Sequence, residues 1–152
     1  MKIPVKIMRI KPMCGVPPDI PRYMTPGAAC VDLNACLDEP MIVKPGEICS
    51  IPTGIAIEIQ SLEYAAFIYA RSGLSLKHGL SLVNGVGVID SDYRGEIKAA
   101  LINLSDCDYT ISQGERVAQM GFMPICHAIF TEVESLNDTV RSCGGFGSTG
   151  KR

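Results

Sequence analysis

The amino-acid sequence predicts an all-β fold, an antiparallel sandwich or barrel such as a jelly roll. Short stretches in which apolar and polar residues alternate recur along the chain between turn signals. The 152 residues include 15 Gly, 10 Pro and no Trp, a composition typical of many short strands joined by turns. A chain of this length forms a single domain that buries about 70% of its unfolded surface.

Each element is predicted from its local pattern. Alternation between apolar and polar positions, bounded by Gly- or Pro-containing turns, indicates strands. Two segments are expected to be helical, a short helix over Ser72 to His78 and a single turn over Glu132 to Asn137. The predicted strands are, in chain order, residues 3–7, a stretch from the turn at Pro45-Gly46 to Pro52, 55–59, 64–70, 97–104 and 117–129, with further turns at Thr53-Gly54, Asn84-Gly85, Arg94-Gly95 and Gln113-Gly114.

Charge and hydropathy narrow the class of partner. A net charge of −2 and a pI of about 5.6 give no reason to expect nucleic acid or a membrane surface as partner, while a small anion held by local cations stays possible. The longest apolar run, residues 64–70, is too short to cross a bilayer, and lysines and arginines interrupt the N-terminal segment where a signal peptide would need an apolar run. We therefore expect a cytoplasmic protein.

The seven cysteines do not indicate a metal site. They include no C-x-x-C pair, and His78 and His127 are the only histidines, so the short paired spacings of structural zinc sites are absent from the sequence. An odd number of cysteines without a secretion signal indicates a reducing compartment and buried thiols.

Four internal segments carry candidate chemistry, and one of them, Gly114 to Gln119, places an arginine and a glutamine on a predicted strand. Arg71-Ser72-Gly73 follows a predicted strand and opens the predicted helix, so it suits a phosphate, or is only a capped strand end. The Asp90 to Gly95 segment follows an apolar stretch, so one carboxylate is expected to face inward beside a ligand, or the segment is a polar hairpin end. Asp32 lies between Val31 and Leu33, and a buried carboxylate must be hydrogen-bonded or lie near a cation.

The last dozen residues have the composition of a phosphate-binding loop but lack the helix that usually supports such a loop. Gly145, Gly147 and Gly150 match G-x-G-x-x-G, and with Lys151 the segment nearly matches a Walker A loop. Both motifs need a helix after the loop to face the phosphate, and only two residues follow Gly150 in this sequence.

Taken together and in order, these segments resemble the five motifs of the homotrimeric dUTPase family, in its bacterial form. The resemblance runs from about Ile3 to Gly150. The matching segments are Ala28 to Leu33, Ala70 to Leu74, Asn84 to Gly95, Gly114 to Gln119 and Arg141 to Gly150.

The resemblance implies a jelly-roll-like β barrel in a homotrimer, with each active site built at a subunit interface from three chains. Residues 1–140 would form the barrel domain. Residues 141–152 would form a flexible Gly-rich arm that closes over the active site of a neighbouring subunit. Another copy of the chain would then provide the support that the arm lacks in its own sequence.

The implied reaction is the hydrolysis of dUTP to dUMP and pyrophosphate with Mg²⁺ as cofactor. Asp90 would orient and deprotonate the water that attacks the α-phosphorus. Asp32 would reach the metal through water, since the triphosphate itself holds most of the ion. The substrate-binding residues would be Asn84, Gly87 and Val88 for uracil, Tyr93 for deoxyribose, Arg71, Ser72, Gly73 and Gln119 for the phosphates, and Arg141, Phe146, Gly147, Ser148 and Thr149 from the arm.

Two positions depart from the family pattern. Cys30 stands where glycine is usual, which matters if the backbone there has a positive φ. Ser142-Cys143 replaces a more Gly-rich lead into the arm.

Two other functions stay open at this stage. The first is a deaminase of the same fold, such as a dCTP deaminase, which would need a carboxylate placed to act on the base. The second is a trimer that binds dUTP without catalysis, which would be expected to lose Asp90 or the arm.

Overall fold

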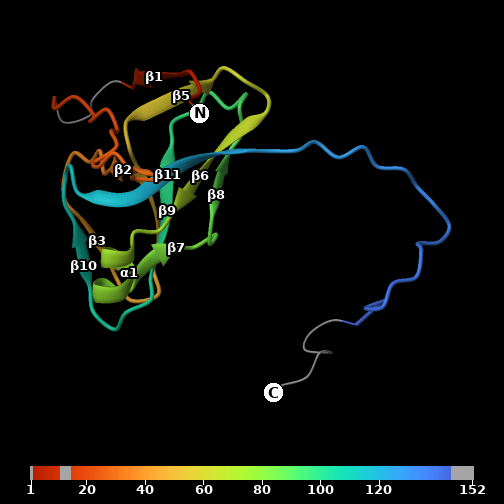
Figure 1. The fold of residues 1–152 in the computed structure, drawn as a ribbon. Coiled ribbons are helices and arrows are strands. Elements are labelled where there is room, and N and C mark those ends of the chain that lie inside the picture. The colour runs from red at the N-terminus through yellow and green to blue at the C-terminus, as the bar shows by residue number, and fades with distance from the viewer. Residues whose placement is uncertain (1, 11–14, 145–152) are drawn as a thin grey trace.

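The computed structural model describes residues 2–10 and 15–144, and in these ranges it has eleven strands and one short helix (Figure 1). In chain order they are β1 Val5–Arg9, β2 Val31–Asn34, β3 Met41–Val43, β4 Ile48–Pro52, β5 Ile55–Ile59, β6 Tyr64–Tyr69, α1 Ser72–His78, β7 Leu80–Leu82, β8 Gly87–Ile89, β9 Lys98–Asn103, β10 Tyr109–Ile111 and β11 Arg116–Pro124.

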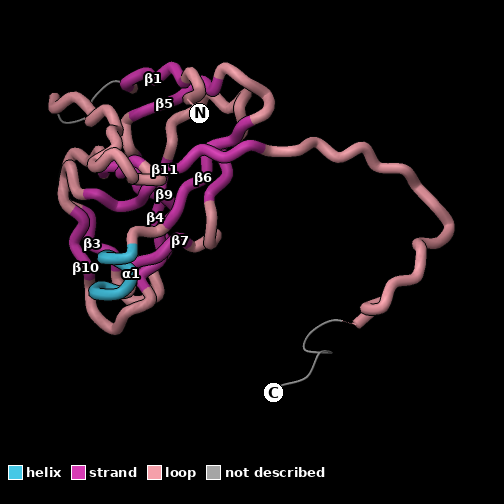
Figure 2. The backbone as a smooth tube through the Cα atoms, viewed as in Figure 1, coloured by secondary structure: helices cyan, strands magenta, loops and turns pink. Residues whose placement is uncertain are grey.

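The strands pair antiparallel in four sheets (Figure 2). The largest has the order β2-β11-β6-β8, and a second has the order β4-β9-β7. Two strand pairs, β1-β5 and β3-β10, complete the arrangement. Neighbours in space are mostly distant in sequence, as expected for the predicted jelly-roll-like fold.

The apolar core lies between these sheets. In β2, Val31 and Leu33 are buried while Asp32 and Asn34 are half-buried on the other face, which is the alternation of a strand with one face towards the core. The buried Asn103 donates to the carbonyls of Val43 and Cys107 at 2.9 and 2.8 Å, so its burial leaves no unpaired amide group. The core joins both large sheets through residues such as Leu33, Ile51, Ile68, Leu80, Leu101 and Val117.

Most predicted elements form where the sequence places them. The predicted helix over Ser72 to His78 is observed with those bounds, and Gly79 ends it with a φ of 69°. The predicted helical turn over Glu132 to Asn137 is wrong, because this segment is extended and has nothing to pack against.

The last strand also ends earlier than predicted, at Pro124 instead of Ile129. The Ile125 amide makes the final bond, to the Glu63 carbonyl at 2.8 Å, and the chain then leaves the sheets (Figures 1 and 2). Residues 126–143 are all exposed, and their large apolar side chains are at least 56% exposed. We call residues 125–144 the tail. The expected division of the chain at residue 140 stays a prediction.

The cysteines differ in burial. Cys36 is buried as expected, and Cys30 and Cys49 are half-buried. Cys107, Cys126 and Cys143 are exposed in the single chain, so the expectation of buried thiols is wrong for these three. Among the residues described, no helix is long and apolar enough to cross a membrane.

Candidate active site

Asp32 lies between two arginines that come from distant parts of the chain. Its Oδ1 accepts a hydrogen bond from Arg71 Nε at 2.8 Å, and its Oδ2 accepts one from Arg116 Nη1 at 3.1 Å. The side chains of Asp32 and Arg71 are only 20% and 24% exposed, which strengthens their charge-assisted bond relative to one on open surface. The prediction that this acid is paired is confirmed.

An irregularity in β11 places Arg116 on the same face as Gln119. The register shifts between Arg116 and Ala118, so both Val117 and Ala118 point into the core and the alternation restarts. Without this bulge, residues three apart on a strand would face opposite sides. Gln119 is opposite Asp32 in β2, and its Nε2 donates to the Ala70 carbonyl at 2.9 Å. We call Asp32, Arg71, Arg116 and Gln119 the ion-pair corner.

The start of α1 adjoins the ion-pair corner. Arg71 is the N-cap residue with extended backbone angles, and no side chain caps the helix, so the first-turn amides have no partner within α1. The first turn carries no acid, and the last turn carries Lys77 and His78. The amides of Ser72 and Gly73 therefore point, with the positive end of the helix dipole, to a place where an anion is favoured.

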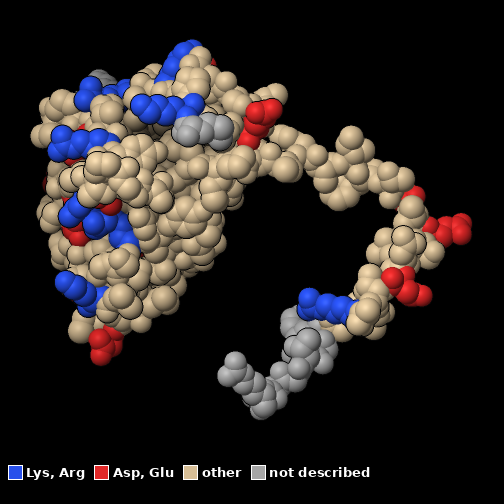
Figure 3. Space-filling model, viewed as in Figure 1, with Lys and Arg blue, Asp and Glu red and all other residues tan. Residues whose placement is uncertain are grey.

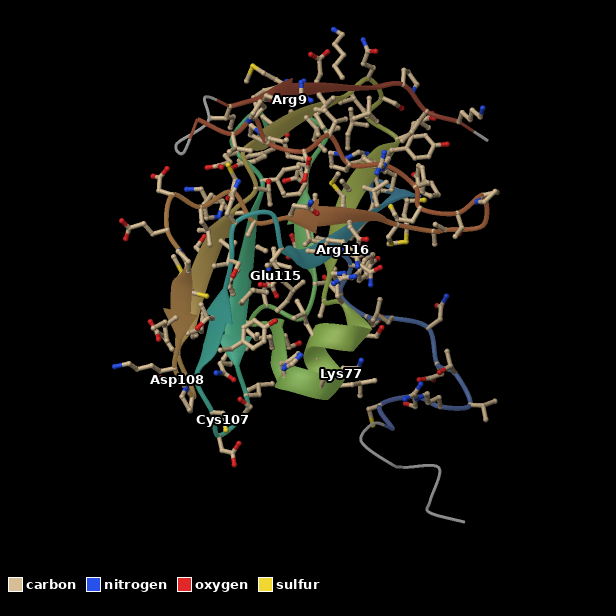
Figure 4. The ribbon with its side chains drawn as sticks, turned by 90° about the vertical axis from the view of Figure 1, so that its left-hand side faces the viewer. Arg9, Lys77, Cys107, Asp108, Glu115 and Arg116 are labelled. Atoms are coloured by element: carbon tan, nitrogen blue, oxygen red, sulfur yellow. The ribbon has the colours of Figure 1, made fainter. Side chains whose placement is uncertain are left out.

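A cavity of about 530 Å³ opens beside the ion-pair corner. Lysine and arginine gather on this side of the body in Figure 3, and the same side faces the viewer in Figure 4, where Arg9 and Arg116 are labelled. The charged residues that line the cavity are three arginines and two aspartates, so the cavity favours an anionic occupant. The lining residues are Arg9, Asp19, Ile20, Pro21, Arg22, Met24, Asp32, Asn34 and Arg116.

Asp90 lies on a tight turn after the edge strand β8. The Tyr93 amide donates to the Asp90 carbonyl at 3.1 Å, and Arg94 Nη1 donates to the carbonyls of Ser91 and Tyr93 at 2.7 and 3.0 Å. Asp90 and Asp92 are both exposed, so the expectation that one carboxylate faces inward is wrong. We call residues Asp90 to Gly95 the acidic turn.

The hairpin before the acidic turn contains the remaining predicted base-binding residues. Gly85 has a φ of 70°, as the turn at Asn84-Gly85 requires. Gly87 is opposite Ile68 of β6, and a Cβ there would lie 3.0 Å from the Ile68 Cβ, so close packing of two strands uses its missing side chain. Val88 points outward and is 58% exposed.

The single chain does not bring the two halves of the predicted site together. Ile89 is opposite Ala66 in the antiparallel β6–β8 pair, so Asp90 lies towards the start of β6 while Arg71 follows its end. That is about six residues along the strand, or roughly 20 Å. The structure thus groups Asp32, Arg71, Ser72, Gly73 and Gln119 in one place and sets Asp90 and Tyr93 apart from them, while Asn84, Gly87 and Val88 lie along β8 and its turn between the two.

One predicted arm residue, Arg141, is among those described, and it lies apart from both groups. Arg141 is on the tail and its Nε donates to the Gly144 carbonyl at 2.9 Å. Phe146, Gly147, Ser148 and Thr149 lie outside the described residues.

Asp32 suits a metal only through water. Both of its oxygens already accept hydrogen bonds from arginines, and no group of three or more His, Cys, Asp or Glu in the described ranges could hold an ion. A direct carboxylate cage for Mg²⁺ is therefore not present in this part of the chain, whereas an outer-sphere contact from Asp32 is compatible with the geometry.

Arg116 is a member of the site, and the sequence pattern assigned it no role, although its place on one strand with Gln119 was visible. It stands just after the Gly114 turn at the start of β11, and a cation at that point of a strand that also carries Gln119 was the available signal. Glu115 beside it accepts a hydrogen bond from Tyr109 Oη at 2.6 Å. Burial and then this contact with Glu115 raise the pKa of Tyr109 to about 12.

The two departures from the family pattern have different structural outcomes. Cys30 does not have a positive φ, and its Sγ would lie 3.0 Å from a Cβ at Gly121, so the thiol occupies space that this glycine leaves. Burial, followed by the nearby Asp32, raises the Cys30 pKa. Ser142 is the one described non-glycine residue with a positive φ, 44°, which is a conformation that glycine adopts more readily.

Comparison with known proteins decides the family. The dUTPase family model matches residues 17–150, which include all five motifs. The chain belongs to the dUTPase family. A deoxyuridine 5'-triphosphate nucleotidohydrolase of Desulfitobacterium hafniense is 53% identical over 133 residues, with 88% of each chain covered. The enzyme of the same name from Sodalis glossinidius is 48% identical over 151 residues, with 99% of each covered.

Solved dUTPase structures share the fold. A Staphylococcus bacteriophage 80alpha dUTPase variant with dUpNHpp has a TM-score of 0.84 at 23% identity, covering 97% of this chain and 99% of its own. The dUTPase of Streptococcus mutans has a TM-score of 0.67 at 34% identity, covering 73% and 89%. The predicted fold class is confirmed.

Proposed function

We propose that this protein hydrolyses dUTP to dUMP and pyrophosphate, and so keeps uracil out of DNA and supplies dUMP for dTMP synthesis in the cytoplasm. The observation that carries the proposal is that the dUTPase match spans residues 17–150 and so includes every motif. The relatives that are about half identical are named for the same reaction.

The ion-pair corner would hold the phosphates. Asp32 and the Arg116 carbonyl hold the Arg71 guanidinium through Nε and Nη1, which leaves Nη2 and the first-turn amides of Ser72 and Gly73 for phosphate oxygens. Gln119 holds the backbone just before Arg71 through the Ala70 carbonyl. These groups need little rearrangement when the ligand binds, which favours affinity.

Asp90 would act as the base that orients and deprotonates the attacking water. A carboxylate is a weak base, yet within a closed site such a group contributes about 10²–10⁴ in rate. Its exposure in the single chain is compatible with a site that other chains complete.

The hairpin from Asn84 to Ile97 would read the base and the sugar. Backbone donors and acceptors near Asn84, Gly87 and Val88 would distinguish uracil from cytosine, since an unpaired buried polar group costs about 1–3 kcal/mol. The Tyr93 ring would pack against deoxyribose, where a 2′-hydroxyl would clash. Mg²⁺, held mainly by the triphosphate with Asp32 in its outer shell, would supply charge neutralisation.

The active site would be completed in a homotrimer. The separation of roughly 20 Å between Asp90 and Arg71 along the β6–β8 ladder supports a site shared between chains. The tail supports it too, because Ile129, Phe130 and Leu136 are 96%, 93% and 86% exposed and would be covered in an assembly. The arm at 141–152 would then close over the active site of a neighbouring subunit.

Product analysis tests the reaction. Purified protein with Mg²⁺ is given dUTP, dCTP, dTTP and UTP in parallel, and we expect only dUTP to be converted, to dUMP and pyrophosphate. Deamination of dCTP would assign the protein to the related deaminases, and tight dUTP binding without turnover would indicate a sensor.

Mixed trimers test the shared site. At a dUTP concentration far below the KM of Arg71→Gln, Asp90→Asn and Arg71→Gln chains are each expected to have little activity alone. After they are mixed, denatured and refolded together, some sites would combine an intact Asp90 with an intact Arg71 and activity would return. No recovery would mean that both groups act within one chain.

A further inference from the structure

The hydroxyl end of the Tyr93 ring lies against the backbone of Gly95. A Cβ built at Gly95 would be 2.3 Å from Tyr93 Oη, 2.5 Å from Cζ and 3.0 Å from Cε2. Real Cβ atoms do not approach other atoms this closely, so any side chain at position 95 would have to displace the ring. Tyr93 is 44% exposed, so much of its side chain stays accessible beside this contact.

The backbone conformation does not account for this glycine. Gly54, Gly79 and Gly85 all have φ near +70°, where only glycine is comfortable, but Gly95 is not among the glycines with positive φ. The Tyr93 ring, and not the backbone conformation, is therefore the reason why position 95 has no room for a side chain.

The hydroxyl of the same ring is anchored by a hydrogen bond. Tyr93 Oη donates to the Glu96 carbonyl at 3.1 Å. The Glu96 side chain accepts a hydrogen bond from the Gly54 amide at 2.9 Å and lies 3.6 Å from Lys98 Nζ, so residue 96 is tied to neighbouring segments. A methyl group added at position 95 would therefore shift the ring and leave the strand in place.

We propose that Gly95 is a positioning residue that sets the height of the Tyr93 ring and, through it, the selection of deoxyribose over ribose. The inference rests on the proposed function, in which Tyr93 packs against the sugar. Room for a 2′-hydroxyl differs from room for a hydrogen by little more than one atom, so the height of this ring decides the selectivity. The hydrogen bond from the Tyr93 amide to the Asp90 carbonyl fixes the other end of the acidic turn.

The test is Gly95→Ala, with Gly27→Ala as the matched control. Gly27 is exposed, has no positive φ and would place its Cβ in open space. kcat/KM is measured for dUTP and for UTP, and the ratio of the two values is the readout, because it does not depend on how much of the enzyme is folded. We expect the ratio to fall by about tenfold or more in Gly95→Ala and to stay unchanged in the control.

Tyr93→Phe separates the two contacts of the ring. It removes the hydroxyl bond to Glu96 but keeps the ring on Gly95, so it should keep most of the selectivity. An unchanged ratio in Gly95→Ala, or lost selectivity in Tyr93→Phe alone, would overturn the inference. A wild-type enzyme that does not prefer dUTP over UTP would instead overturn the proposed function, so the two failures are distinct.

Discussion

The ion-pair corner and the acidic turn differ in how far one chain builds them. In the corner, Asp32, Arg71 and Gln119 come from three neighbouring strands or strand ends, and each side chain already has partners at 2.8–2.9 Å. In the acidic turn the backbone is well braced, but the Asp90 carboxylate makes no hydrogen bond or ion pair with any described residue. In the proposed function, the phosphate-binding groups are already held in place within one chain, whereas the catalytic carboxylate would gain its partners from other chains.

This difference has a physical reason. A carboxylate that already accepted two strong hydrogen bonds would be a poorer base, because those bonds favour its charged form. Arginines that bind phosphate gain from the opposite arrangement, since a fixed guanidinium loses less entropy when it binds. The environments of the ion-pair corner and the acidic turn therefore fit the roles that we propose for them.

Removal of the Asp90 carboxylate should give the largest effect. Asp90→Asn is expected to lower kcat by about 10²–10⁴ while the fold and the binding of dUpNHpp are kept, because the residue is exposed. Asp92→Asn, an exposed acid of the same turn, is the control and should keep most activity. Equal losses in both variants would mean that the turn needs its overall charge and that Asp90 has no special role.

Removal of Mg²⁺ tests whether the metal belongs to the substrate or to the protein. With EDTA, turnover should fall by about 10²–10³ and return when Mg²⁺ is added. The melting temperature of the nucleotide-free protein should not change, because both Asp32 oxygens are already occupied by arginines. A melting temperature that falls with EDTA would instead show a metal bound by the protein itself.

Loss of the guanidinium tests the preorganised half. Arg71→Gln should raise KM for dUTP by about ten- to a hundredfold, because it removes charge-assisted bonds to phosphate and frees Asp32. Lys77→Gln on the same helix removes one positive charge near the site without touching the corner. A similar KM in both variants would mean that the loss of one positive charge explains the effect and that Arg71 makes no specific bond to phosphate.

The smallest effect concerns the hydrogen bond between Tyr109 and Glu115, the residue before Arg116. The Tyr109 pKa of about 12 lies above its ordinary value of 10.0, so the folded protein holds this proton more tightly than the unfolded chain. The resulting stability is complete below pH 10 and is lost as the pH rises from 10 to 12. Urea midpoints of Tyr109→Phe should therefore fall less over this range than those of the wild type. Tyr23→Phe, at an exposed tyrosine, should behave as the wild type.

The sequence predicted elements whose signals are local. The helix over Ser72 to His78 has a strand before it and Gly79 after it, and both signals lie within ten residues. Strands such as β5 and β9 were visible through their apolar pattern. The strands β3, β7 and β10 have only three residues each, which is too short for a period to show.

The site was predicted as a set of residues but not as an arrangement. Arg116 and Asp32 are 84 residues apart, and their contact depends on a bulge that no periodic pattern reveals. The exposure of Asp90 was missed because the apolar stretch before it belongs to an edge strand, whose burial depends on what lies beside it. Long-range strand pairing decides both cases, and it leaves no local signal in the sequence.

The extended tail has a consequence for the lifetime of an unassembled chain. Proteases bind their substrates as extended, accessible backbone, and residues 126–143 are exposed and without helix or strand. A copy that has not met its partners would be cut there before the sheets themselves were attacked. Limited digestion would therefore report on assembly, and in a cell the same exposure would remove copies that remain single.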